Sequence, residues 1–122
     1  MNYIKYQQGD VILQQVSEEE FNASSEIKHK INTHETRAVL AEGEGTGHYH
    51  AVYMEDMLDN AGITLCKNSE YDRQNRGIVV TGAAVELRHE EHHTLTLEPG
   101  FYLQRIVKEY DHISGITRRV AD

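Results

Sequence analysis

A chain of 122 residues, of which 39% are hydrophobic and 26% charged, is predicted to form one globular domain over residues 1–122. The formal net charge of −8 and the lack of a basic patch argue against nucleic acid as a partner. A single cysteine excludes an intrachain disulfide, and no apolar run reaches the roughly 18 residues that a membrane span needs. We therefore expect a cytoplasmic protein that makes no membrane contact.

Short apolar alternations, rich in Val, Ile, Thr, Leu and Tyr, predict β-strands along most of the chain. In chain order the predicted strands cover residues 10–16, 36–43, 48–54, 62–67, 77–89, 93–107 and 115–120. One short peripheral helix is predicted after the first strand, because Ser17 and Glu20 have the spacing of a capping box. Residues 68–77 are predicted to form a long polar loop. This pattern predicts an all-β fold, either a small antiparallel β-barrel or a jelly roll.

Residues 43–56, GEGTGHYHAVYMED, place two histidines one residue apart after a glycine-rich lead-in. On a strand, His48 and His50 point to the same side, together with Val52 and Met54. Two neutral imidazoles at this spacing can share one metal ion. An exposed polar pair, or two hydrogen-bonded histidines at the mouth of a barrel, would have the same pattern.

A second group of histidines lies at the predicted tip of a hairpin. If Glu90 and Glu91 form a two-residue turn, His89 faces His92. If the loop has three residues, His89 faces His93, and apolar residues pair as Leu87 with Leu95 and Val85 with Leu97. The second register is favoured, because it keeps apolar residues on one face. Either register brings two histidines together, which suits a metal site.

Glu55 follows the first histidine pair in an acidic stretch. It lies an odd number of residues from His50, so on a regular strand it faces the opposite side. The alternative is that Glu55 is a solvent-exposed carboxylate on the surface, without a role in metal binding. Cys66 lies among apolar residues and is predicted to be a buried, inert thiol. Arg105 stands in an apolar strand and is expected to form a salt bridge or to meet an anionic ligand.

The spacing from the HxH pair through Glu55 to Gly62 resembles the first motif of the cupin superfamily. The resemblance covers residues 43–62. It implies a small antiparallel barrel of the jelly-roll type. It also implies that His48, His50 and Glu55 are metal ligands, joined by one later histidine from the set His89, His92 and His93. Cupin-like barrels often pair through edge strands, so the resemblance further implies a homodimer.

Two functions from different classes agree with these features. The first is a metal-dependent enzyme that uses zinc, iron, nickel or manganese on a small organic molecule, with Glu90 and Glu91 as the nearest acid–base groups. The second is a non-catalytic binding module with a structural metal or none. A third, less favoured, is a pH-responsive element, because clustered histidines titrate near neutrality.

Overall fold

The computed structural model describes residues 4–24, 29–31, 36–42, 47–67, 75–111 and 116–119. Its strands are β1 (Lys5–Gln8), β2 (Val11–Val16), β3 (His29–Ile31), β4 (Arg37–Glu42), β5 (Tyr49–Tyr53), β6 (Gly62–Lys67), β7 (Arg76–Thr81), β8 (Val85–His89), β9 (His92–Leu97), β10 (Gly100–Ile106), β11 (Lys108–Asp111) and β12 (Ile116–Arg119). Among the described residues, the helical segments are α1 (Glu18–Ala23) and the single 3-10 turn η2 (Met54–Asp56).

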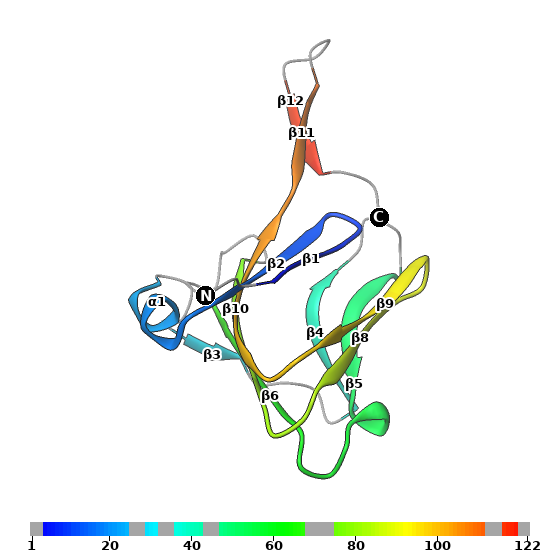
Figure 1. The fold of residues 1–122 in the computed structure, drawn as a ribbon. Coiled ribbons are helices and arrows are strands. Elements are labelled where there is room, and N and C mark those ends of the chain that lie inside the picture. Colours follow the sequence, from blue (N-terminus) through cyan, green and yellow to red (C-terminus); the bar gives the residue numbers. More distant parts are fainter. Residues whose placement is uncertain are drawn as a thin grey trace.

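Two antiparallel sheets face each other and enclose the core (Figure 1). One sheet has six strands in the order β1-β2-β10-β7-β6-β3, and the other has four in the order β4-β5-β8-β9. Strands β11 and β12 pair in a separate two-stranded sheet. The all-β prediction is therefore confirmed. The closed barrel is not, because the described strands of the two sheets do not join into one continuous hydrogen-bonded ladder.

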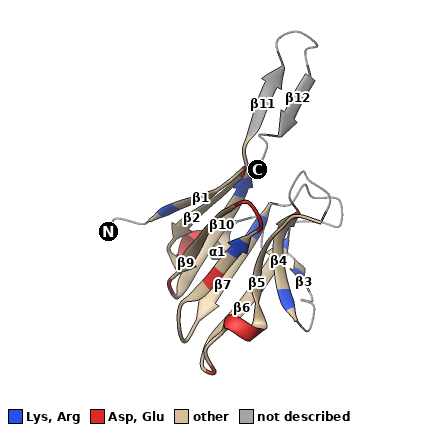
Figure 2. Cartoon of the chain, turned by 90° about the vertical axis from the view of Figure 1, so that its right-hand side faces the viewer, with Lys and Arg blue, Asp and Glu red and all other residues tan. Residues whose placement is uncertain are grey.

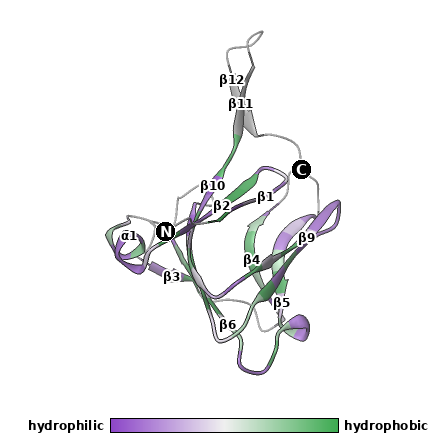
Figure 3. Cartoon of the chain, viewed as in Figure 1, coloured by the Kyte–Doolittle hydropathy of each residue, from purple (hydrophilic) through white to green (hydrophobic). Residues whose placement is uncertain are grey.

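Apolar alternation explains which face of each strand is buried. In β8, residues Val85 and Leu87 point inward and are buried, whereas Glu86 and Arg88 point outward. In Figure 3, hydrophobic colour is seen along β4 and β5, which also contribute to the core. The largest fully buried apolar side chains come from both sheets: Leu13, Leu40, Leu65, Ile78, Leu87, Leu97 and Tyr102.

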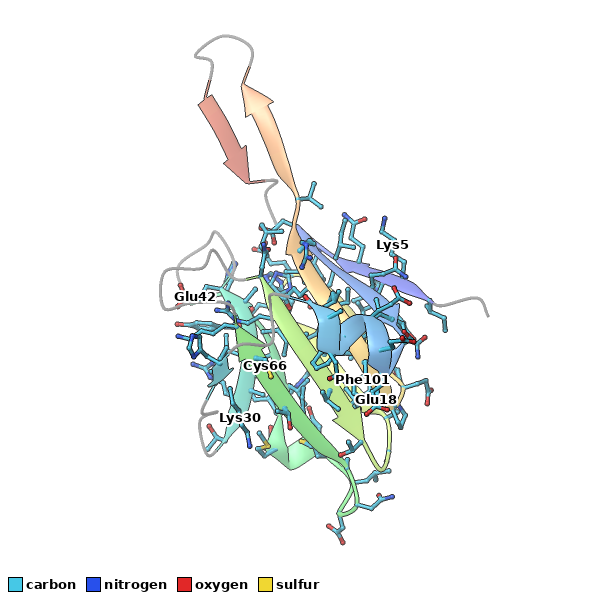
Figure 4. All side chains as sticks on the ribbon, turned by 90° about the vertical axis from the view of Figure 1, so that its left-hand side faces the viewer. Lys5, Glu18, Lys30, Glu42, Cys66 and Phe101 are labelled. Carbon is cyan, nitrogen blue, oxygen red and sulfur yellow. The ribbon has the colours of Figure 1, made fainter. Side chains whose placement is uncertain are left out.

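Helix α1 begins where the sequence predicted it. The Ser17 side chain caps the helix by accepting a hydrogen bond of 3.1 Å from the Glu20 backbone N–H. Phe21, the buried residue of α1, packs on Phe101 with ring centres 5.2 Å apart. The helix lies across the face of the six-stranded sheet that is turned to the viewer in Figure 4.

Two long predicted strands are each divided by a turn. Residues 77–89 split into β7 and β8 at Gly82, which has φ +78° and whose Cβ would lie 1.7 Å from the Asn60 carbonyl oxygen. Residues 93–107 split into β9 and β10 at Pro99.

Strands β1, β3 and β11 were not predicted. Residues 43–46 and most of the predicted polar loop, residues 68–74, lie outside the described residues. None of the described helices is long and apolar enough to cross a membrane.

The β8–β9 hairpin combines the two registers that the sequence allowed. Val85 pairs with Leu97 and Leu87 with Leu95, as the favoured register predicted. His89, however, pairs with His92 across a two-residue turn, so the prediction that it faces His93 was wrong. A register shift between Leu87 and His89 reconciles the two, because one extra residue in β9 is absorbed as a bulge.

Candidate functional site

Four histidine rings gather at one end of the sandwich, where the start of β5 meets the β8–β9 turn. The ring centres of His89 lie 5.6 Å from His48, 4.3 Å from His50 and 4.6 Å from His92. The rings of His50 and His92 are stacked at 6.3 Å. We call these four residues the histidine cluster. In Figure 3 the β8–β9 tip and the start of β5 are hydrophilic, in contrast to the apolar parts of the same strands.

The histidine cluster runs from the core to the surface. His50 is 0% exposed and His89 is also buried. His92 is partly buried, and His48 reaches the surface, where its Nε2 lies 3.9 Å from an exposed carboxylate oxygen of Glu91. A small ion could therefore enter beside His48 and still be held by buried groups.

Gln8, at the end of β1, contacts His50 through its side-chain amide. Its side-chain NH₂ group donates to the backbone carbonyls of Leu87 and His93, at 2.9 Å each. These carbonyls flank the register shift of the β8–β9 hairpin, so Gln8 supplies donors where the ladder is interrupted. The amide oxygen of Gln8 then faces His50 Nδ1 at 2.8 Å. Because that oxygen only accepts, Nδ1 must carry the proton, and the lone pair of a neutral His50 ring lies on Nε2.

Asp10 lies on the other side of His50, in the β1–β2 turn. It is 0% exposed, and its Oδ1 is 3.5 Å from His50 Nε2. Its backbone carbonyl accepts a hydrogen bond of 2.8 Å from the Val107 N–H, which fixes the turn against the end of β10. Figure 1 places this turn at the same end of the sandwich as the start of β5 and the β8–β9 tip.

The remaining rings of the histidine cluster differ in which ring nitrogen has a hydrogen-bond partner. His89 Nδ1 accepts a hydrogen bond of 3.1 Å from the Glu91 backbone N–H, so in a neutral ring its proton is on Nε2. In the described part of the structure, the buried nitrogens His48 Nδ1 and His92 Nε2 have no hydrogen-bond partner. Buried polar atoms are nearly always paired, so these two atoms require an explanation.

Glu90 ties the hairpin tip to β5. Its carboxylate accepts a hydrogen bond of 3.0 Å from the Tyr49 backbone N–H. Burial alone would raise the pKa of Glu90, but hydrogen bonds from backbone N–H groups, including that of Tyr49, and the neighbouring His89 and His48 lower it below its ordinary value. Glu90 is therefore an ionised acceptor at neutral pH, which does not suit the acid role considered for it.

Two of the predicted ligands lie outside the histidine cluster. Strand β5 ends at Tyr53, and the turn η2 carries Glu55 outward, where 77% of its side chain is exposed. Its carboxylate lies 3.2 Å from the Arg88 guanidinium, which also contacts Asp56 at 2.8 Å. Figure 2 shows η2 as an acidic turn at the far end of β5. His93 is exposed and meets the site through its backbone carbonyl, which Gln8 binds.

Cys66 and Arg105 are also away from the histidine cluster. Cys66 is half-buried on β6, opposite Lys30 of β3 (Figure 4). Burial raises the pKa of its thiol, and Lys30 offsets this only in part, so it is a weak nucleophile at neutral pH. Arg105 is exposed and donates to the Gln104 carbonyl at 3.0 Å.

As the side chains stand, no three His, Cys, Asp or Glu residues within the described ranges are placed to hold a metal ion. The donor chemistry nevertheless fits one, because imidazole nitrogens and a buried carboxylate are ligands for zinc, iron, nickel and manganese. What the geometry lacks is convergence of the donor atoms, which depends on the rotation of the imidazole rings.

Fold and site together define an antiparallel β-sandwich with a largely buried histidine cluster at one end. The chain belongs to the family described as Domain of unknown function (DUF8820), which matches residues 7–107. The matched range contains Gln8, Asp10 and all four residues of the histidine cluster, and it ends where β11 begins. No curated protein and no solved structure matches the chain.

Proposed function

We propose that this protein binds one divalent transition-metal ion at the histidine cluster. The observation that carries the proposal is the pair of buried nitrogens, His48 Nδ1 and His92 Nε2, that lack a hydrogen-bond partner in the described part of the chain. Each such atom costs about 1–3 kcal/mol of folding free energy. Binding a ligand at these nitrogens would remove that cost, and with His50 Nε2 they offer three imidazole lone pairs.

Ring spacing shows which rings must move for the cluster to hold one ion. Two imidazoles bound to one ion through bonds of about 2.0–2.1 Å have ring centres about 4.6 Å apart at a right angle, and about 5.4 Å apart at the tetrahedral angle. Three of the four ring spacings, 4.3, 4.6 and 5.6 Å, are close to these values, and each of them joins His89 to another ring of the cluster. The fourth, 6.3 Å between His50 and His92, requires the rings to move together. Small departures from side-chain rotamers cost about 0.5–1.5 kcal/mol each, which metal binding readily offsets.

His89 takes the central place among the four rings. Its Nδ1 is held by the Glu91 backbone N–H, so His89 joins the ligands only if that bond is released. We assign His48, His50 and His92 as the first ligands and His89 as the ring against which they pack. The donor set contains no thiolate, which favours zinc, iron, nickel or manganese over copper(I).

The cupin resemblance extends this proposal to a jelly-roll fold, a homodimer paired through edge strands and a cytoplasmic location. A hollow of about 130 Å³, lined by Tyr53, Arg88, His89 and Glu90, could take a small organic ligand next to the histidine cluster. An open coordination position would make the bound metal a Lewis acid and the protein an enzyme. A saturated site would make the protein a metal-stabilised binding module.

Metal content and affinity test the proposal directly. The full chain is stripped with a chelator, reconstituted with zinc, iron, nickel or manganese, and analysed by elemental analysis and calorimetry. We expect one ion per chain for the wild type and at least about 100-fold weaker binding for His92→Gln. His93→Gln is the matched control, because His93 is the exposed neighbour, and it should bind like the wild type.

Two results would overturn the proposal. One is a wild type that retains none of the four metals after reconstitution. The other is equal binding by His92→Gln and the wild type, which would place the ion elsewhere. In the first case the histidine cluster would be a buried polar network in a metal-free binding module.

A further inference from the structure

We infer that Asp10 is the carboxylate ligand of this metal site, and that Gln8 positions His50 to bind the same ion. The inference rests on the proposed function and deepens it. It assigns to Asp10 the carboxylate role that the cupin resemblance gave to Glu55, and it draws the β1–β2 turn into the site.

The first argument is the tautomer of His50. The NH₂ group of Gln8 is committed to two carbonyls, those of Leu87 and His93, so its oxygen must be the atom that meets His50 Nδ1. This contact leaves the lone pair of a neutral ring on Nε2 and directs it toward Asp10. A histidine that binds a metal through one nitrogen commonly donates the other N–H to a fixed acceptor, which is the role of Gln8 here.

The second argument is the distance between His50 Nε2 and Asp10 Oδ1. At 3.5 Å it exceeds the roughly 2.7–2.9 Å of a charge-assisted hydrogen bond. Two ligands bound to one ion at about 2.0–2.2 Å, with a tetrahedral angle between them, are about 3.4 Å apart. The separation therefore matches a pair of atoms that share a metal ion better than a pair that shares a proton.

The third argument is burial. Both side chains are 0% exposed. With Asp10 ionised and His50 neutral, the carboxylate oxygen and the Nε2 lone pair would repel each other at low dielectric. A divalent cation between the two atoms turns this repulsion into attraction. The competing arrangement is an imidazolium–carboxylate ion pair, with the proton on Nε2.

Cobalt(II) binding by the full chain separates the two arrangements. We expect the wild type to bind cobalt(II) with a visible absorption band. Asp10→Asn keeps the shape but removes the charge, so we expect its affinity to fall about 10- to 100-fold or more and its band to shift. Asp59→Asn is the matched control, because Asp59 is exposed in the loop after η2, and it should match the wild type.

The outcomes distinguish this inference from the proposed function. If the wild type binds cobalt(II) and Asp10→Asn has the same affinity and spectrum, Asp10 is not a ligand, although the histidine site stands. If the wild type binds neither cobalt(II) nor any of zinc, iron, nickel and manganese, both fail.

A measurement on the unmutated chain covers the case in which Asp10→Asn does not fold. NMR of histidine-labelled, zinc-loaded protein should find the His50 proton on Nδ1 and none on Nε2. A proton on Nε2 in the loaded protein would overturn the inference.

Discussion

Gln8→Ala should destabilise the protein far more than the same change at the neighbouring Gln7. Gln8 is 3% exposed and makes three hydrogen bonds, to the Leu87 and His93 carbonyls and to His50 Nδ1. Each bond contributes about 1 kcal/mol net, and each buried partner that is left unpaired costs about 1–3 kcal/mol. We expect a loss of at least about 3 kcal/mol in the free energy of unfolding.

Gln7 is the matched control because it lies on the opposite face of the same strand. It is exposed, and its side chain donates one hydrogen bond of 3.1 Å to the Gly9 carbonyl. Gln7→Ala should change stability by less than about 0.5 kcal/mol. Urea unfolding followed by circular dichroism measures both variants, with a chelator present so that metal binding does not contribute.

The expected loss is large enough to measure well. For a domain of this size, 3 kcal/mol corresponds to a decrease of about 10–15 °C in Tm. A difference below about 1 kcal/mol between Gln8→Ala and Gln7→Ala would refute the reasoning. It would mean that the three buried partners of Gln8 find other partners at little cost.

Three further predictions concern residues outside the histidine cluster. Gly82→Ala should lower the free energy of unfolding by more than about 2 kcal/mol, because the added Cβ meets the Asn60 carbonyl. Gly47→Ala has φ +77° but open space around the new Cβ, so it should cost about 1 kcal/mol. Similar decreases in Tm for the two variants would contradict this. Glu55→Gln should leave metal content unchanged, and a loss of metal would restore Glu55 as a ligand. Because burial raises the pKa of Cys66, iodoacetamide at pH 8 should alkylate the folded protein more slowly than the urea-unfolded chain, and equal rates would refute that cause.

The β8–β9 hairpin shows how far local pattern extends. Apolar alternation alone predicted the pairs Val85–Leu97 and Leu87–Leu95, because one face of the hairpin must be buried. The pairing of His89 with His92 requires a bulge, and apolar alternation does not mark it. The bulge is supported by Gln8, which is 79 residues from Leu87 in the chain and meets it only after the sheets form.

Gln8 and Asp10 were the functional candidates that sequence reasoning missed. Both are polar residues: Asp10 begins a predicted strand and Gln8 lies just before it, where such residues are usually solvated. Their burial depends on the β8–β9 hairpin and on Val107, which cover the β1–β2 turn from distant parts of the chain. The one local signal was the inward position of Gln8 in the alternation of β1, and that strand was itself not predicted.

The sequence by itself determined the features that depend on near neighbours. Alternation with a period of two specified most strands and their buried faces, the Ser17–Glu20 spacing specified the helix start, and the HxH spacing directed His48 and His50 to one end of β5. Only the tertiary structure decided which histidines meet, that Glu55 turns outward and that Asp10 and Gln8 enclose His50. The physical reason is that strand pairing is non-local: periodicity says which face of a strand is buried, but not which strand, turn or carboxylate lies against it.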